Sequence, residues 1–416
     1  FLASRVCYRD KNAAKQTDEV AAKARIVARG DRDPDLLALR RDAPTMTRTG
    51  FYVVLNIIAS FNMIMFGGDI AGAFMQGLQE LAQRELPLFL TQPREGLPGL
   101  HPLQLLLVVR GVFGLANSPR LWWRSLRDMF RKLGAKQLSL DRAVFVLYDI
   151  VAGILRPVVI VGVHVDDLIG GYSHESPKAR QMIKQLKDTF KFGQWQENED
   201  MIYCGKNVTL KPGEIFVSQK MFTENITVPS IPKSRSADPS QKLMPAEITE
   251  RLSARGSMNW LVGQTRPDLG ASAALCKGSN QDVRSLMDIL AVLKEAVKTK
   301  TAGNWIRKMD LWSSLILIFS DASWANAEDL SSIGGYLIFL ASPDVLKPEG
   351  GCINLVEWRS AKVKRKCKST LTAETIAMEA ALDAGLHVRT IVAEAPYRLS
   401  LIHISEPTRR RGMADC

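Results

Sequence analysis

The fold of this chain is decided by the stretch Pro157-Val-Val-Ile-Val-Gly-Val-His-Val-Asp-Asp-Leu-Ile-Gly-Gly171. An apolar run, Ala143–Tyr148, precedes it, and Gly153 separates the two, so together they predict a β-hairpin. The second strand ends in Asp166-Asp167, which places two adjacent carboxylates where the chain turns. Adjacent aspartates also occur by chance in a chain of this composition, and a solvated turn would then explain them. Their position directly after an apolar strand favours a functional site.

A third carboxylate follows another predicted strand. Apolar residues recur at helical spacing from Val54 to Phe61. The pattern then changes to a strand, Met63–Phe66, with a break at Gly67-Gly68 and Asp69 at the strand's end. Carboxylates brought together at strand ends repel one another unless a divalent cation neutralises them. Two Mg²⁺ ions can activate a 3′-hydroxyl and stabilise a leaving pyrophosphate, so phosphoryl transfer with Mg²⁺ is expected, with Mn²⁺ as the alternative ion.

Two helices have clear start signals. Ser118-Pro119 provides the predicted N-cap and first helical position of one helix, which Gly134 ends. Ser176-Pro177 repeats the signal for a second helix that extends to Phe192. Near the N-terminus, Lys23–Gly30 is similar to a short basic strand.

The C-terminal part has a different order, three strands and then a helix. Leu315–Phe319 is predicted as a buried strand that ends in Ser320-Asp321. A hairpin, a basic loop and a helix follow, at Gly334–Leu340 with Ile353–Trp358, at Lys362–Lys368, and from about Thr372. This order differs from everything before it and predicts a separate C-terminal domain.

The composition favours a folded protein that binds nucleic acid. Hydrophobic residues make up 46% of the chain and charged residues 24%, and the net charge is +12. This basic excess favours nucleic acid over an anionic membrane, because no amphipathic basic helix stands out. The six cysteines are scattered without a C-x-x-C pair, so neither a zinc site nor a disulfide framework is expected. No apolar stretch gives a clean membrane span, and no signal peptide opens the chain.

Eight short motifs carry a resemblance to a known family. They are Lys23–Gly30, Asp69–Gly77, Gly111–Trp123, His164–Asp167, Met201–Gly205, Thr265–Asp268, Ser320–Ala325 and Ser369–Glu374. In this order they resemble the reverse transcriptase–ribonuclease H region of copia-type retrotransposon Pol polyproteins. The resemblance implies an α+β fold, a right-hand polymerase with fingers, an antiparallel-sheet palm and a thumb, followed by an incomplete ribonuclease H-like α/β domain. The implied bounds are 1–200 for fingers and palm, 201–310 for primer grip, thumb and connection, and 311–398 for the ribonuclease H-like domain.

The resemblance also assigns the polymerase site. Asp69, Asp166 and Asp167 would be the catalytic carboxylates that hold two metal ions, with the Ile70 carbonyl as a further ligand. Phe74 would lie under the sugar and exclude a 2′-hydroxyl, and plain core packing is the alternative for this residue.

Other matched positions would contact the substrates. Lys23 and Arg25 would bind the incoming triphosphate, although a solvated strand face explains them nearly as well. Asn117 belongs to the segment Leu115–Pro119, which would lie along the template and nucleotide. The primer contacts would be His164, Tyr203, Cys204 and Gly205. This chain has His164 where the family usually has Tyr, and Asn117 where the family often has Gln. Neither change removes a metal ligand.

In the C-terminal domain, Asp321 and Glu374 resemble a remnant of the ribonuclease H site. Lys362–Lys368 would lie against the phosphates of an RNA–DNA hybrid, and a solvated charge run is an equal alternative. Asp383 lies within the same helix as Glu374 and is not assigned to the site. Residues 399–416 are expected to be non-native, because Leu399–Arg409 resembles the translation of a sequencing adapter, and ribonuclease H activity is expected to be lost by truncation.

The sequence thus predicts an RNA-directed DNA polymerase of a retrotransposon that adds nucleotides to a primer 3′-hydroxyl with Mg²⁺. Its expected partners are an RNA or DNA template-primer, deoxynucleotides and other parts of the same polyprotein. Its expected location is the cytoplasm, in a retroelement particle, or the nucleus, with neither secretion nor a membrane. Two alternatives stay open: a decayed remnant that at most binds nucleic acid, and a stand-alone two-metal nuclease, which the polymerase-like order of motifs weakens.

Overall fold

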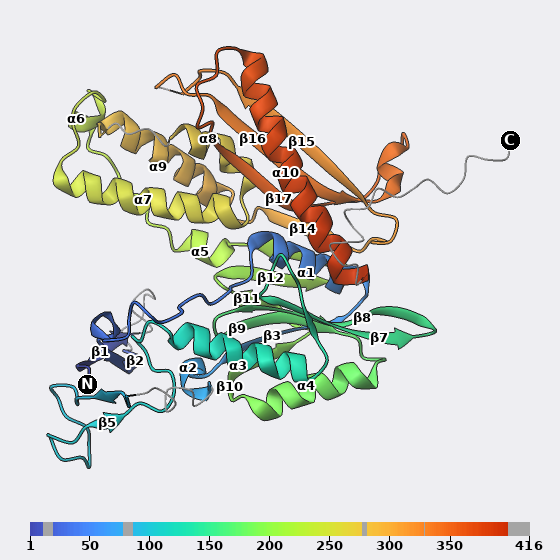
Figure 1. The fold of residues 1–416 in the computed structure, drawn as a ribbon. Helices are drawn as coiled ribbons and strands as arrows, with labels where there is room; N and C mark the ends of the chain where they lie inside the picture. The colour runs from blue at the N-terminus through green and yellow to red at the C-terminus, as the bar shows by residue number, and fades with distance from the viewer. Residues whose placement is uncertain (11–19, 78–85, 277–280, 328, 398–416) are drawn as a thin grey trace.

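A six-stranded antiparallel sheet lies at the centre of the lower half of the molecule (Figure 1). The computed structural model describes residues 1–10, 20–77, 86–276, 281–327 and 329–397. The strand order is β10-β3-β9-β8-β7-β6. The strands are β3 (Ile64–Ile70), β6 (Lys136–Gln137), β7 (Val144–Val151), β8 (Ile154–His164), β9 (Asp167–Tyr172) and β10 (Phe192–Glu197). The predicted hairpin is confirmed as β7 and β8, and the mixture of helices and sheets confirms the α+β class.

Strand β3 runs through the glycine pair at which the sequence predicted a break. A side chain at Gly67 would collide with Met201, and one at Gly68 would collide with Phe192. The glycines therefore leave room for neighbouring side chains and do not end the strand. Strand β3 continues through Asp69 to Ile70.

Two amphipathic helices pack on the sheet through a second cluster of buried residues. They are α3 (Ser118–Lys132) and α4 (Pro177–Thr189). Ser176 is the predicted N-cap of α4, and its hydroxyl accepts a hydrogen bond from Ala179 N at 3.2 Å. In α3 the cap position is Asn117, one residue earlier than predicted, because the Ser118 hydroxyl instead donates to the Val112 carbonyl at 2.8 Å.

Helix α1 (Arg48–Ser60) lies between this sheet and the upper half of the molecule (Figure 1). Ten of its 13 residues are buried, so it has no solvent-facing side of the usual kind. A four-stranded sheet contacts it, with the order β11-β12-β13-β14. Its strands are β11 (Met201–Tyr203), β12 (Lys206–Lys211), β13 (Glu214–Ser218) and β14 (Gly303–Arg307).

The N-terminal region forms two small ribbons and a short helix. The first ribbon pairs β1 (Ser4–Asp10) with β2 (Ala22–Ala28), which confirms the predicted basic strand. The second pairs β4 (Phe89–Leu90) with β5 (Leu106–Leu107), and Leu2 N donates to the Phe89 carbonyl at 2.8 Å, which ties the two ribbons together. Helix α2 (Ala73–Gln76) follows β3.

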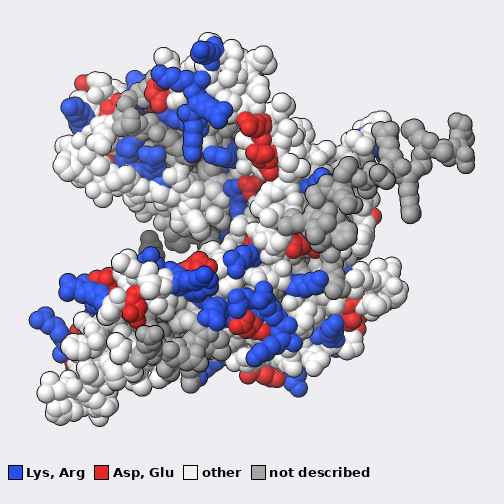
Figure 2. All heavy atoms as spheres, in the orientation of Figure 1, with Lys and Arg blue, Asp and Glu red and all other residues white. Residues whose placement is uncertain are grey.

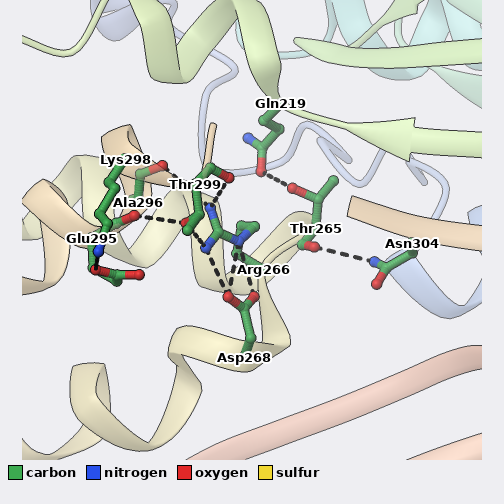
Figure 3. A network of polar contacts seen from close by, with 9 residues as sticks. All are labelled: Gln219, Thr265, Arg266, Asp268, Glu295, Ala296, Lys298, Thr299 and Asn304. Atoms are coloured by element: carbon green, nitrogen blue, oxygen red, sulfur yellow. Dashed lines mark hydrogen bonds and ion pairs between the residues drawn. The ribbon is translucent and has the colours of Figure 1, made fainter. Parts of the chain in front are cut away.

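A group of helices fills residues 220–298. They are α5 (Lys220–Glu224), α6 (Lys233–Ser236), α7 (Pro245–Gln264), α8 (Gly270–Leu275) and α9 (Val283–Lys298). Arg266, which is 2% exposed, joins the ends of α7 and α9 (Figure 3). Its guanidinium donates to Asp268 at 2.7 and 2.9 Å and to the Thr299 hydroxyl at 2.7 Å. The motif Thr265–Asp268 is therefore a structural clamp, since a buried guanidinium needs such partners.

The C-terminal part has the predicted order of three strands and a helix. Its sheet has the order β15-β16-β17, formed by β15 (Leu315–Ser323), β16 (Ile333–Ala341) and β17 (Ile353–Lys362), with α10 (Thr370–Tyr397) packed across β15 and β16. The prediction that Leu315–Phe319 is buried is wrong. Strand β15 pairs with β16 on one side only, so it is an edge strand, and Phe319 is 57% exposed.

The C-terminal part shares buried side chains with the rest of the chain. One cluster of buried side chains includes Leu55 of α1, Val208 of β12, Val356 of β17 and Val388 of α10. Polar contacts cross the same boundary, where Arg48 pairs with Glu357 and lies 3.9 Å from the Trp358 ring centroid. Parts that are distant in sequence therefore share one core. Among the described residues, no helix is long and apolar enough to cross a membrane.

Candidate active site

The three predicted carboxylates lie where β3, β8 and β9 meet. Asp69 on β3 is the cross-strand partner of Asp167 on β9, and His164 at the end of β8 pairs with Asp167 on its other side. Directly paired residues on adjacent antiparallel strands have Cα atoms about 4.5–5.5 Å apart. Asp166 is in the turn between β8 and β9, and its carbonyl accepts a hydrogen bond from Ile70 N at 3.0 Å. The structure therefore brings Asp69, Asp166 and Asp167 together.

The turn that carries Asp166 is strained, and a side chain of α3 supports it. Val165 has a φ of +58°, in the left-handed region that a β-branched residue rarely adopts. The Trp122 indole N–H of α3 donates to the Val165 carbonyl at 2.6 Å and holds this conformation. Strain of this kind persists only where the surroundings enforce it, and it concentrates at functional sites.

Burial and the neighbouring charges raise the pKa of Asp167 to about 6. Burial is the largest cause, and the neighbouring Asp166 and Asp69 carboxylates act in the same direction. The Cys204 thiol, 3.6 Å from Asp167 Oδ2, opposes them as a hydrogen-bond donor. Burial and then Asp167 raise the pKa of this thiol to about 12, so it keeps its proton at neutral pH. A bound cation would relieve the repulsion between these neighbouring carboxylates.

The predicted primer contacts divide into surface and core residues. Cys204 and Gly205 form the turn between β11 and β12, with positive φ angles of +45° and +74°. The Tyr203 ring instead stacks on Phe51, with centroids 5.5 Å apart, and is 4% exposed. Its side chain therefore supports the turn from within the core, and its role as a primer contact stays a prediction. His164 is exposed at the rim of the site.

Lys206 is a buried cation that sequence reasoning did not find. It is 5% exposed, its Nζ lies 4.7 Å from the Phe51 ring centroid, and it donates to Gln264 Oε1 at 3.2 Å. Burial lowers its pKa, while Cys204 and Asp167 oppose that shift. The only sequence signal was its position next to the Tyr203–Gly205 turn.

The predicted nucleotide contacts gather around another missed residue, Phe113. Its ring packs edge-on against Phe74 at 5.5 Å, and the Arg25 guanidinium lies 4.9 Å from the same ring. Phe74 remains partly exposed, and Lys23 occupies the same face of β2 as Arg25. Asn117 is 6% exposed, and in the described part of the chain its side-chain oxygen has no hydrogen-bond partner. A buried oxygen without a partner is costly, and a hydrogen-bond donor on a ligand would relieve that cost.

Gly193 of β10 is a further missed position. A Cβ there would lie 3.1 Å from Asp69 Oδ2, so glycine leaves room for the carboxylate. No local pattern marks this glycine, because its neighbour comes from a strand far away in sequence.

The candidate ribonuclease H residues of the C-terminal part form a less complete site than the three aspartates do. Asp321 is exposed on edge strand β15, opposite Gly335, and Glu374 is half-buried in the first turns of α10. Asp383, which the sequence did not assign, lines a separate cavity beside Gly334 and Lys362.

The metal assignment rests on the chemistry of the donors. Three carboxylates at one strand end, one with a raised pKa, fit a hard divalent cation. Within the described ranges, however, no three His, Cys, Asp or Glu side chains already converge as a metal-binding group. The carboxylates are neighbours, and their role as metal ligands stays a prediction.

Comparisons with known proteins identify the family. Residues 2–231 match the family described as "Reverse transcriptase (RNA-dependent DNA polymerase)". The chain is 25% identical over 371 residues to the retrovirus-related Pol polyprotein from transposon RE2 of Arabidopsis thaliana, and 24% identical over 374 residues to that from transposon RE1. Each alignment covers 85% of this chain and 23% of the relative, so the chain spans about a quarter of those polyproteins. The resemblance to copia-type Pol polyproteins is thereby confirmed, and the chain belongs to the reverse transcriptase family.

Proposed function

We propose that this chain is an RNA-directed DNA polymerase of a retrotransposon, which extends a primer 3′-hydroxyl on an RNA or DNA template. The observation that carries the proposal is the meeting of Asp69, Asp166 and Asp167 at one end of the β3–β9–β8 unit. The strained Val165 turn and the raised pKa of Asp167 support it, because a protein maintains strain and charge repulsion together where function requires them.

In this proposal the elements take the parts of a right-hand polymerase. The six-stranded sheet with α3 and α4 is the palm, the β1–β2 ribbon belongs to the fingers, and α5–α9 form the thumb. The β15–β17 sheet with α10 is the ribonuclease H-like part. The nucleotide would lie between Arg25 and the carboxylates, with Phe74 beneath its sugar and Asn117 beside it.

Each side chain has a defined task in this arrangement. The Asp69, Asp166 and Asp167 carboxylates would hold Mg²⁺, and bound Mg²⁺ supplies the positive charge that activates the primer hydroxyl and stabilises the leaving pyrophosphate. The Cys204 thiol donates to Asp167 Oδ2 and fixes the orientation of that carboxylate. Trp122 holds the turn that presents Asp166. Phe113 positions both Phe74 and Arg25.

Primer extension on a homopolymer RNA template tests the proposal. Asp166→Asn is expected to abolish extension by the purified chain, because an amide cannot replace the negative charge that neutralises Mg²⁺. Asp188→Asn, which changes an exposed acid on α4, is the matched control and is expected to retain activity. Extension that survives in the Asp166 variant contradicts the site. If neither the parent chain nor the control extends a primer, the alternative of a decayed remnant is correct.

A further inference from the structure

Helix α3 has a line of arginines on the face opposite its core contacts. Successive residues of an α-helix are rotated by about 100°, which places Arg120, Arg124, Arg127 and Arg131 within about 60° of one another. These four residues are called the α3 stripe. The line spans about 16 Å, from the rise of about 1.5 Å per residue. No basic amphipathic helix was expected from the sequence, but α3 is one.

The region around the α3 stripe has a large local excess of positive charge. Residues 118–142 contain seven Lys and Arg and two Asp, and the whole chain has a net charge of +12. One of those acids, Asp141, is 2% exposed and accepts hydrogen bonds from Thr47, so it does not offset the surface charge. Two other carboxylates do offset part of it, since Asp128 pairs with Arg127 at 2.6 Å and Asp42 pairs with Arg120 at 2.5 Å. Arg131 is exposed and the other three arginines of the stripe are half-buried, so the surface keeps a positive excess after these pairs are counted. Figure 2 shows Lys and Arg gathered over the front of the lower half, where Figure 1 places α3.

Trp123 holds two of the cations of this surface side by side. Its ring is 3% exposed, with the Arg127 guanidinium 5.0 Å from the ring centroid and the Arg142 guanidinium 5.3 Å from it. Arg127 also pairs with Asp128 at 2.6 Å, so a carboxylate already offsets one of the two positive charges held over this ring. The indole N–H of Trp123 is also buried and has no hydrogen-bond partner in the described part of the chain.

A membrane surface does not fit this helix. Basic amphipathic helices bind lipid by inserting their apolar face. The apolar face of α3, which includes Trp122, Leu126 and Phe130, is instead buried against the sheet. Only the charged face is available, so the partner is a polyanion that is recognised through its charge.

The position of α3 selects single-stranded nucleic acid. The helix begins at Asn117, beside the proposed nucleotide site, and Trp122 contacts the catalytic turn. The α3 stripe faces the other way, about one helix diameter of 10–12 Å from that turn. Duplex nucleic acid is too stiff to bend around a single helix, since its persistence length is about 150 base pairs. An unpaired strand can bend there, and a strand carries a charge about every 3.4 Å, so the stripe could contact about five phosphates.

We propose that the α3 stripe binds the backbone of single-stranded nucleic acid outside the active site, as a track for the unpaired part of the template. The binding surface stands on the charge and geometry of α3 alone. Its assignment to the template rests on the proposed polymerase function.

Salt-dependent binding of a labelled oligo(U) strand tests the surface. The triple variant Arg124→Gln, Arg127→Gln, Arg131→Gln is compared with the parent chain by fluorescence anisotropy. The loss of three phosphate contacts is expected to make the slope of log K against log salt shallower by about 2, at about 0.7 per contact for single strands. Arg131→Gln alone removes one exposed arginine and is expected to shift the slope by about 0.7, with no change in the melting temperature.

The matched control removes three cations from another helix of the same sheet. Lys178→Gln, Arg180→Gln, Lys184→Gln changes exposed residues of α4 and is expected to leave the slope unchanged. The proposal is overturned if the stripe variant and the α4 variant have equal slopes of log K against log salt. It is also overturned if the stripe variant loses as much binding to an RNA–DNA duplex as to the oligo(U) strand.

Primer extension separates this inference from the proposed function. On primed templates with a long unpaired strand, the stripe variant is expected to extend less well than on templates with a short one, while the α4 control extends both equally. If no protein extends either template but the binding slopes differ as stated, the polymerase proposal fails and the surface stands. Equal extension of long and short templates by an active stripe variant refutes the template track.

Discussion

Replacing Asp167 by Asn is expected to stabilise the metal-free protein at neutral and alkaline pH while it removes activity. The pKa of Asp167 is about 6 in the folded chain, against 3.8 for the ordinary carboxyl. Well below pH 3.8 the group is protonated in both states, so it does not affect the free energy of unfolding there. Between these values the folded state binds more protons than the unfolded state, and stability therefore falls as pH rises through 6. Asn is never charged and does not incur this loss.

The magnitude follows from the shift. A difference of about two pKa units at 1.36 kcal/mol each gives about 3 kcal/mol as an upper value. Asp167 is only half-buried, and solvent screening reduces the effect to about 1.5 kcal/mol. The variant is therefore expected to exceed the parent chain in the free energy of unfolding by about 1.5 kcal/mol above pH 7, and by almost nothing near pH 4.

Urea unfolding followed by tryptophan fluorescence, in EDTA and over this pH range, measures the difference. Asp188→Asn is the control and is expected to show no pH-dependent gain. Added Mg²⁺ is expected to stabilise the parent chain and not the Asp167 variant, because a ligand stabilises only the state that binds it. A variant that is no more stable than the parent at pH 8 in EDTA would refute the argument that burial and the neighbouring carboxylates disfavour the charged form of Asp167.

Three further predictions concern other parts of the chain. Phe74→Ala is expected to raise ribonucleotide incorporation relative to deoxynucleotide in a competition assay, because it opens space beneath the sugar; an unchanged ratio in an active variant assigns Phe74 to the core. The chain is not expected to cut a labelled RNA–DNA hybrid with Mg²⁺ or Mn²⁺, since Asp321 is exposed on an edge strand and, in the described part of the chain, Glu374 is its one candidate partner; cleavage that disappears in Asp321→Asn would contradict this. Arg48→Ala is expected to cost about 3 kcal/mol in the free energy of unfolding, because it leaves the partly buried Glu357 unpaired; a loss below about 1 kcal/mol in urea unfolding would show that this pair contributes little.

Local signals in the sequence were enough to predict three strands of the six-stranded sheet, β3, β7 and β8. The β7–β8 hairpin and the positions of Asp69 and Asp166 follow from apolar runs and the residues that end them. Caps such as Ser176 are equally local, because the cap bonds to a residue three positions away. These features depend on neighbours in sequence, so one sequence suffices to find them.

The remaining features depend on contacts between distant segments. Gly193 is required because Asp69 lies against it, and Lys206 is buried because Phe51 and Gln264 surround it. An apolar run such as Leu315–Phe319 predicts a strand but not whether a second strand pairs with its outer edge. For the same reason the buried position of Tyr203 and the shared core could not be predicted.

The shared core has a consequence for synthesis on the ribosome. Arg48 of α1 bonds to Glu357, 309 residues later in the chain. At about 5–20 residues per second, roughly 15–60 seconds pass between the emergence of these two residues. During that interval the apolar surface of α1 that β17 and α10 cover in the finished fold has no partner. The nascent chain is therefore a client for chaperones that bind exposed apolar segments, and its yield in a heterologous host should depend on their supply and on translation speed.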